Sequence, residues 1–369
     1  MQDIDSMFAV CNLRGRQING WNVISKIPSP DMSKGETGGN FSICYFVEKN
    51  GEECFMKVLD YRHLYFGHLS SGEMRIDVVN RGTQEFKYEM DLSRRCTEHN
   101  LKRVVAFVDG GEIEIPEFII PTVTYIIYEK AEGNIRQVLD LTRKTLLLDK
   151  LNSLSDKLKS LHDITLGVQQ LHNIDISHQD IKPSNILYVL GESKLGDLGR
   201  ALCLDSSVSC PFSLKGFWGD LGYAPPEALF RFYLEDEKLR IYQMDNYMIG
   251  SLIVYYICGV SFNTLMNSHL PINMKDMARS GISYSEAKLQ LVNAYHSALL
   301  DFENDIDIDD IKRPLVQIVE YLCNPDPEKR GHPKNVAKSS RTSNYNLERT
   351  ISELDLILRK AEIAIRKFK

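Results

Sequence analysis

The chain has 369 residues, of which 43% are hydrophobic and 25% are charged, and its net charge is −6. This profile indicates a soluble globular protein, long enough for two domains or one large bilobal unit. The acidic balance excludes a general attraction to nucleic acid or to anionic membranes. The longest nearly apolar stretch, residues 247–262, is shorter than the roughly 20 residues of a membrane-spanning helix. We therefore predict a buried core helix there and no transmembrane segment.

The eight cysteines are scattered along the chain, and no two of them form a Cys-x-x-Cys pair. A disulfide framework or a zinc site is therefore not expected, and reduced thiols in a cytoplasmic protein are the simplest interpretation. The N-terminal stretch MQDIDSMFAV carries acidic residues where a secretory signal has basic ones, which argues against secretion.

The first part of the chain has the pattern of a sheet. Residues 40–60 indicate a strand, a turn at Asn50-Gly51 and a second strand. Residues 84–100 have the apolar spacing of a helix. Two further strands are predicted at 104–111 and 122–130, which are rich in β-branched and aromatic residues.

After Gly133 the pattern becomes helical. Leucines recur at helical spacing at Leu139, Leu146, Leu151, Leu154, Leu158 and Leu161. We therefore predict an α+β fold of two lobes. Its parts are an N-terminal extension (1–19), a small sheet-rich lobe (20–131), a larger helical lobe (132–335) and a C-terminal amphipathic helix (336–369).

The end of the chain carries a heptad pattern. Apolar residues separated alternately by four and three positions fall at Leu347, Ile351, Leu354, Leu358, Ala361, Ile365 and Phe368. We interpret this as a terminal helix docked on the larger lobe. A coiled-coil contact with another chain, which would give self-association or partner docking, is the alternative, because three heptads are near the lower limit for a stable coil.

The stretch ISHQDIKPSN, residues 176–185, concentrates the groups that phosphoryl transfer requires. Such transfer needs an oriented hydroxyl and cations that neutralise the phosphate oxygens. Asp180 can hold the hydroxyl and accept its proton, and Lys182 can reach the transferring phosphate. Asn185 can ligate Mg²⁺ through its carbonyl oxygen.

A second carboxylate follows in KLGDLGR, where Asp197, Leu198 and Gly199 come after a predicted strand and turn. This spacing would bring Asp197 beside the first loop, as the main Mg²⁺ ligand. Asp-x-Gly alone is a common turn, so its distance from residues 176–185 carries the prediction.

Together these motifs resemble the eukaryotic-type protein kinase family over residues 20–335. The resemblance implies that Lys57 in FMKVL holds the α- and β-phosphates of ATP. It implies that Glu89, or alternatively Glu85, pairs with Lys57 from the helix at 84–98. In KGETGGNFSICYF, the amides of Gly38 and Gly39 would approach the phosphates.

The stretch YIIYEKAEGN is similar to the family's connector between lobes. The resemblance places Tyr128 at the back of the nucleotide pocket, and it assigns the adenine hydrogen bonds to the Glu129 carbonyl and the Ala131 amide.

Three later motifs continue the resemblance in order. GYAPPEAL supplies Glu227, NPDPEKRGHP supplies Arg330 as its ion-pair partner, and MDNYMIG supplies Asp245 and Gly250 at the expected start of a central buried helix. The Glu227–Arg330 pair would anchor the segment that receives a peptide, and this favours a protein substrate over a small molecule.

One departure from the family concerns regulation. Gln179 stands where the family has an arginine that pairs with a phosphate on the activation loop, and a glutamine has no charge for this. We predict activity without phosphorylation of Ser206, Ser207, Ser209 or Ser213. Lys182 resembles the serine/threonine-specific branch. The alternatives to such a kinase are a nucleotide-binding pseudokinase scaffold and a small-molecule kinase.

Overall fold

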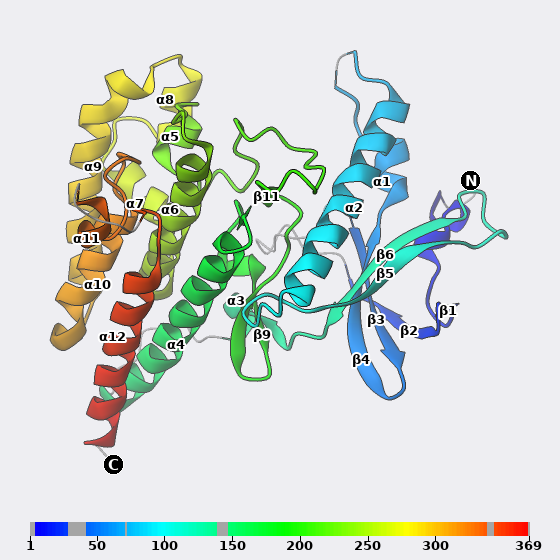
Figure 1. Cartoon of the computed structure of the whole chain (residues 1–369), viewed down its shortest axis with the longest axis horizontal. Coiled ribbons are helices and arrows are strands. Elements are labelled where there is room, and N and C mark those ends of the chain that lie inside the picture. The colour runs from blue at the N-terminus through cyan, green and yellow to red at the C-terminus, as the bar shows by residue number, and fades with distance from the viewer. Residues whose placement is uncertain (1–3, 29–41, 71, 139–146, 338–342, 368–369) are drawn as a thin grey trace. The chain divides into compact units, whose positions relative to one another are not determined.

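The computed structural model describes residues 4–28, 42–70, 72–138, 147–337 and 343–367. The chain divides into two compact units, Met1–Glu132 (unit 1) and Gly133–Lys369 (unit 2). Unit 1 is built mainly on a sheet and unit 2 mainly on helices (Figure 1). The predicted α+β class is therefore confirmed.

Unit 1 contains an antiparallel sheet in the order β1-β2-β3-β4-β6-β5. Its strands are β1 (Gln17–Ile18), β2 (Trp21–Lys26), β3 (Ser42–Lys49), β4 (Glu52–Leu59), β5 (Phe107–Glu114) and β6 (Thr122–Glu129). Its helical segments are η1 (Ile4–Met7), η2 (Ala9–Cys11), α1 (Tyr61–Phe66) and α2 (Arg75–Glu98). The long helix α2 packs against α1 and β5 (Figure 1).

The β3–β4 hairpin confirms the predicted strand, turn and strand. Asn50 and Gly51 both have positive φ, 56° and 84°, as a two-residue hairpin turn requires. On β4, Cys54, Met56 and Val58 alternate into the core, so the strand's other face carries Phe55 and Lys57.

The described N-terminal residues are packed into unit 1. Phe8, Val10 and Leu13 are each at most 1% exposed, and the Tyr45 hydroxyl donates to the Val10 carbonyl at 2.7 Å. Residues 4–19 therefore contribute to the core of the unit that carries the sheet.

Two boundaries differ from the predicted ones. Helix α2 begins at Arg75 instead of residue 84. Strand β5 occupies Phe107–Glu114 instead of 104–111, because its pairing with β6 continues through Gly110 and Gly111 to Glu114. Glycines weaken a strand by propensity, so the pairing partner extends β5 where the local sequence does not.

Unit 2 is largely helical. Its helices are α3 (Ile135–Val138), α4 (Leu147–His172), α5 (Pro226–Leu229), α6 (Glu237–Cys258), α7 (Phe262–Ser268), α8 (Met274–Arg279), α9 (Tyr284–Asp305), α10 (Asp309–Leu322), α11 (Pro333–Val336) and α12 (Glu348–Arg366). Short segments complete it: β7 (Gly133–Asn134), β8 (Ile176–Ser177), η4 (Pro183–Asn185), β9 (Ile186–Val189), β10 (Glu192–Leu195) and β11 (Leu202–Cys203). Leu139, Leu146 and Phe368 lie outside the described residues.

Helix α6 is the buried core helix predicted for the apolar stretch, but its predicted start at Asp245 was wrong. The helix begins at Glu237, where the Asp236 side chain accepts a hydrogen bond from the Leu239 amide as an N-cap. Asp245 lies in mid-helix and is fully buried. A Cβ on Gly250 would lie 2.5 Å from Cys323 Sγ, so this glycine allows α6 and α10 to pack closely.

Within the described residues, we find no single helix of the length and apolarity that crossing a membrane requires. Helices α6 and α7 meet that criterion only as a pair, which bends by 79° at the break between them.

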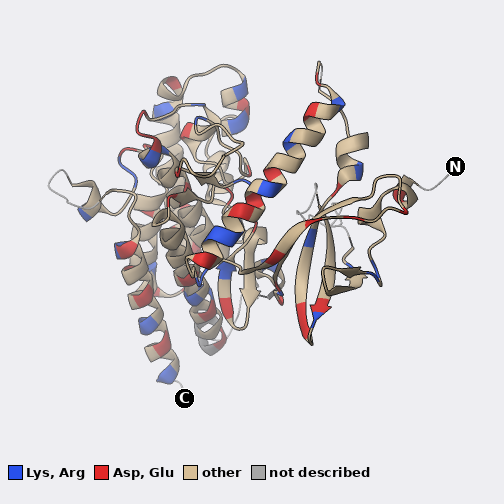
Figure 2. Ribbon diagram, turned by 45° about the vertical axis from the view of Figure 1, so that its right-hand side comes forward, with Lys and Arg blue, Asp and Glu red and all other residues tan. Residues whose placement is uncertain are grey.

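Helix α12 packs along α4 and also contacts α10 (Figure 1). The buried heptad positions include Leu347, Leu354 and Ala361, all at most 2% exposed, and Ile357 is buried beside them. Acidic and basic residues are interspersed along α12, the helix that ends near the C-terminus in Figure 2. The apolar seam is therefore covered by helices of the same chain, and self-association stays a prediction.

Candidate active site

Lys57 lies on β4, between β3 and β6, and so occupies a central strand of the sheet. Its Nζ is 2.7 Å from Glu89 Oε1 and 2.9 Å from Oε2, so Glu89 on α2 is the residue with which it pairs. The Lys57 side chain is 16% exposed and that of Glu89 is 5% exposed. Removing one member of such a pair leaves an uncompensated buried charge.

Two residues that the sequence did not link to Glu89 hold it in place: Tyr128, which the resemblance placed at the back of the nucleotide pocket, and Ser93. The Tyr128 hydroxyl donates to Glu89 Oε1 at 3.2 Å, and it lies 3.1 Å from Ser93 Oγ. Ser93, one helical turn after Glu89, also donates to the Glu89 carbonyl at 2.8 Å. The contact of Ser93 could have been predicted from its position four residues after Glu89 on the same helix face. The contact of Tyr128 could not, because it depends on the pairing of β6 with β4.

The residues predicted to hold adenine and the phosphates are only partly described. Glu129 ends β6, and its side chain accepts from the Ala106 amide at 2.7 Å. Ala131 lies two residues after Glu129 and is partly exposed. Gly38 and Gly39 lie outside the described residues. The adenine contacts of the Glu129 carbonyl and the Ala131 amide stay predictions.

In unit 2 the structure brings Asp180, Lys182 and Asn185 together. Lys182 Nζ and Asn185 Nδ2 each lie 2.9 Å from Asp180 Oδ2. Asn185 Nδ2 also donates to the Asp180 carbonyl at 2.9 Å, which closes the loop on itself. Asp180 Oδ1 accepts from the backbone amide of Asp220 at 2.8 Å. The carboxylate therefore has a fixed orientation, which a residue that positions a hydroxyl needs.

The buried carboxylate of Asp245 holds the start of this loop. Its oxygens accept from the backbone amides of His178 and Gln179, both at 2.9 Å, and from Ser177 Oγ at 2.8 Å. His172 Nε2 lies 2.9 Å from the same carboxylate. A carboxylate that accepts several hydrogen bonds inside a protein fixes the backbone that donates them.

A second set of contacts joins the loop to the turn that carries Asp197. His178 Nε2 lies 3.1 Å from the Gly196 carbonyl, and the Gly196 amide donates to the Asn185 carbonyl at 2.9 Å. Asp197 is exposed and has a φ of 61°, while Leu198 beside it is buried. The structure thus brings the backbone of the Asp197 turn beside Asn185.

The donor chemistry of Asn185 and Asp197 fits a magnesium ion. Both offer hard oxygen atoms. Because Asn185 Nδ2 donates to Asp180, the side-chain oxygen Oδ1, which accepts a 3.4 Å contact from Ser184 Oγ, is the atom of Asn185 that could ligate the ion. Within the described part of the chain, no group of three or more His, Cys, Asp or Glu side chains is arranged to hold a metal. A magnesium site here would therefore rely on phosphate and water oxygens for its remaining ligands.

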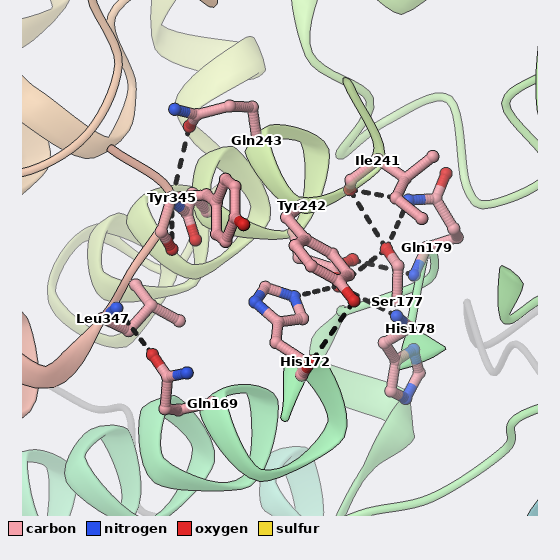
Figure 3. A network of polar contacts seen from close by, with 12 residues as sticks. Gln169, His172, Ser177, His178, Gln179, Ile241, Tyr242, Gln243, Tyr345 and Leu347 are labelled. Atoms are coloured by element: carbon pink, nitrogen blue, oxygen red, sulfur yellow. Dashed lines mark hydrogen bonds and ion pairs between the residues drawn. The ribbon is translucent and has the colours of Figure 1, made fainter. Parts of the chain in front are cut away.

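Gln179 is fully buried, in contrast to a residue that must reach a phosphate. Its Nε2 donates to Ser177 Oγ at 2.7 Å and to the Ile241 carbonyl at 3.0 Å (Figure 3). Its φ is 63°, so the backbone turns sharply between strand β8 and Asp180. The side-chain amide of Gln179 therefore holds the loop through buried hydrogen bonds and offers no positive charge to a phosphate.

The pair expected between Glu227 and Arg330 is bidentate, at 2.7 and 2.8 Å, with Arg330 fully buried. The guanidinium also donates to the carbonyls of Gln243 and Asn324. Burial alone would lower the pKa of Arg330, but attraction to the Glu227 carboxylate raises it overall. This pair ties α5, which contains Glu227, to the loop between α10 and α11, which contains Arg330.

Asp220 is a further residue that the sequence did not indicate. It precedes the Pro-Pro-Glu segment, and its carboxylate lies 3.6 Å from Lys182 Nζ. No spacing rule links positions 180 and 220, so only the folded chain reveals this contact.

The family model described as "Protein kinase domain" matches residues 75–340. A leucine-rich repeat receptor-like serine/threonine-protein kinase of Arabidopsis thaliana is 28% identical over 207 residues, which is 53% of this chain and 21% of that protein.

Two other relatives align over more of the chain. The inhibitor of nuclear factor kappa-B kinase subunit alpha of Gallus gallus is 24% identical, covering 81% of this chain and 37% of its own length. A calcium/calmodulin-dependent protein kinase of Metarhizium anisopliae is 24% identical, covering 79% of this chain and 68% of its own length. The chain thus spans well under half of the first two relatives. Since the family model covers more than half of the chain, the chain belongs to the protein kinase domain family.

Proposed function

We propose that this protein is an ATP-dependent kinase that transfers the γ-phosphate of ATP to serine and threonine hydroxyls of protein substrates. The observation that carries the proposal is the carboxylate of Asp180, oriented by Asn185, Lys182 and the Asp220 amide. Such an arrangement suits the orientation of an attacking hydroxyl, on which phosphoryl transfer mainly depends.

Each unit supplies part of the proposed chemistry. In unit 1, Lys57 would bind the α- and β-phosphates, and its pairing with Glu89 fixes its position. In unit 2, Asp180 would orient the hydroxyl and accept its proton, and Lys182 would contact the transferring phosphate. Mg²⁺ held by Asn185 and Asp197 would supply positive charge against the phosphate oxygens when bound.

The class of substrate rests on two supports. Lys182 resembles the serine/threonine branch of the family, and two leucine-rich repeat receptor-like relatives from Arabidopsis thaliana are named as serine/threonine-protein kinases. The Glu227–Arg330 pair supports a peptide-binding segment and hence a protein substrate. We also propose a cytoplasmic location, because the eight cysteines, all among the described residues, form no disulfide.

Transfer from labelled ATP tests the proposal. The protein is incubated with γ-labelled ATP and Mg²⁺, alone and with a basic acceptor protein, and the labelled residue is identified by phosphoamino-acid analysis. Asp180→Asn and Lys57→Met should each abolish labelling. Two exposed residues give matched controls, Asp175→Asn, which pairs with Lys238, and Lys87→Met on α2, and both should label normally.

The same assay separates the alternatives. Nucleotide binding without any label would support a pseudokinase scaffold. ATP consumption with small-molecule acceptors but no protein label would support a small-molecule kinase. Label found on tyrosine would contradict the proposed hydroxyl class.

A further inference from the structure

Asp220 places a second carboxylate beside the proposed catalytic one. Its backbone amide donates to Asp180 Oδ1 at 2.8 Å, and its Oδ2 lies 3.6 Å from Lys182 Nζ. Lys182 in turn lies 2.9 Å from Asp180 Oδ2. Two carboxylates therefore share one ammonium group, and the trio carries a net charge of about −1 when all three are ionised.

The backbone fixes the position of Asp220 on both sides. A Cβ on Gly219 would lie only 1.9 Å from the Gln179 carbonyl oxygen. The backbone at Gly219 is therefore in direct contact with the loop that carries Asp180. On the other side, the Gly222 amide donates to Asp220 Oδ1 at 2.8 Å, and the Tyr223 amide donates to the Asp220 carbonyl at 3.0 Å. The carboxylate is therefore held in one orientation beside Asp180.

Accessibility distinguishes the two carboxylates. The Asp180 side chain is 8% exposed and that of Lys182 19%, whereas that of Asp220 is 37% exposed. A substrate whose hydroxyl reaches Asp180 has its neighbouring side chains within a few ångströms, because consecutive Cα atoms are about 3.8 Å apart. Asp220 is the acidic group that those neighbours would meet.

We propose that Asp220 is a specificity-determining residue, which selects substrates carrying a lysine or arginine next to the accepting hydroxyl. The inference rests on the proposed kinase function and deepens it. A basic neighbour would find an oriented carboxylate in a locally acidic environment, and an acidic neighbour would be repelled. When Lys182 contacts a phosphate, its positive charge compensates the Asp220 carboxylate less. The attraction of Asp220 for a basic substrate residue is then stronger during transfer.

A series of peptides tests this inference. The peptides share one central serine and differ only in the two flanking residues, which are both lysine, both glutamine or both glutamate. For the native protein we expect kcat/KM to fall at least about tenfold from the lysine to the glutamate peptide, the equivalent of one well-placed charge interaction.

Asp220→Asn removes the charge and keeps both the backbone amide and an oxygen that can accept from Gly222. We expect it to reduce the lysine preference to about twofold, chiefly by raising KM for the lysine peptide more than KM for the glutamine peptide. Asp220→Glu should restore part of the preference. Glu362→Gln, which removes one exposed acidic charge from α12, should leave it intact.

Three outcomes would overturn the inference. The native protein could show equal kcat/KM for the three peptides, or Asp220→Asn could keep the full lysine preference. Alternatively, Asp220→Asn could lower kcat equally on all three peptides, which would mean that Asp220 only positions Lys182. If the native protein labels no peptide and no protein, the proposed kinase function itself fails, and the inference fails with it.

Discussion

Tyr128 donates a hydrogen bond to Glu89, the residue that neutralises Lys57 inside unit 1. The phenol thereby connects the end of β6 to the middle of α2, and the charged pair that we propose for phosphate binding depends on a neutral third member. This relationship gives a first test of the site.

Tyr128→Phe should lower both the stability of the protein and its affinity for nucleotide. The substitution removes one hydrogen bond to a buried carboxylate, which typically contributes about 1.5 kcal/mol or more to the free energy of unfolding. We expect a loss of this size in urea unfolding and a KM for ATP raised by up to about tenfold. Tyr65→Phe, at an exposed position on α1, should change neither quantity. An unchanged KM for ATP would show that Tyr128 does not contribute to nucleotide binding.

Asp180 and Asp197 should fail in different ways when each is changed to asparagine. Asp180→Asn removes the proposed general base and should lower kcat by about 10²- to 10⁴-fold at every Mg²⁺ concentration. Asp197→Asn weakens a proposed Mg²⁺ ligand, so raising the Mg²⁺ concentration should recover part of the activity of this variant. A titration of rate against Mg²⁺ for both variants decides the matter. Equal rescue of both, or of neither, would contradict this division of roles.

Phosphorylation of the segment after Asp197 should have little effect on activity. Gln179 is buried and hydrogen-bonded to Ser177 and Ile241, so it offers no cation to a phosphate. Treatment with phosphatase, or replacement of Ser206, Ser207, Ser209 and Ser213 together by alanine, should change kcat/KM by less than about twofold. A loss that is reversed by phosphomimetic glutamates would show that another cation takes up the phosphate.

Arg330→Met should be one of the most destabilising substitutions in unit 2. It leaves the Glu227 carboxylate buried without its partner, which typically costs about 3–5 kcal/mol. The double variant with Glu227→Leu should be more stable than Arg330→Met alone, because no charge is then left buried without compensation. Chemical denaturation of the single and double variants measures this coupling, and additive losses would argue against it.

Helix α12 offers a closely matched pair of leucines. Leu354 is fully buried against the same chain, whereas Leu356, two residues later, is 55% exposed. Leu354→Ala should reduce the free energy of unfolding by about 2–4 kcal/mol, and Leu356→Ala by less than about 0.5 kcal/mol. If Leu356→Ala instead dissociates an oligomer in light scattering, the exposed face of α12 is an interface between chains.

The sequence predicted those parts of the site that lie close together along the chain. Asp180, Lys182 and Asn185 fall within six residues, and their chemistry is legible from their types and spacing. Lys57 and Glu89 lie 32 positions apart, and only the family resemblance linked them before their contact was seen.

The remaining features depend on tertiary contacts that no local pattern encodes. Asp220 reaches Asp180 across 40 residues, and Tyr128 reaches Glu89 across 39. The start of α6 was misplaced because this helix is buried on nearly every side, including Gln243, Asp245 and Asn246. A helix that is buried all round shows no periodic polar face by which its limits could be recognised.

Residues beyond 340, where the family model stops matching, pack against helices α4 and α6. Tyr345 packs edge-on against Tyr242 at 5.0 Å, Tyr242 stacks on His172 at 3.9 Å, and the Leu347 amide donates to Gln169 (Figure 3). His172 in turn contacts Asp245, which holds the start of the loop that carries Asp180. Fragments that end at residue 340 would lack Tyr345, the outer ring of this aromatic stack. Recombinant fragments should therefore retain the chain through the end of α12 at Arg366.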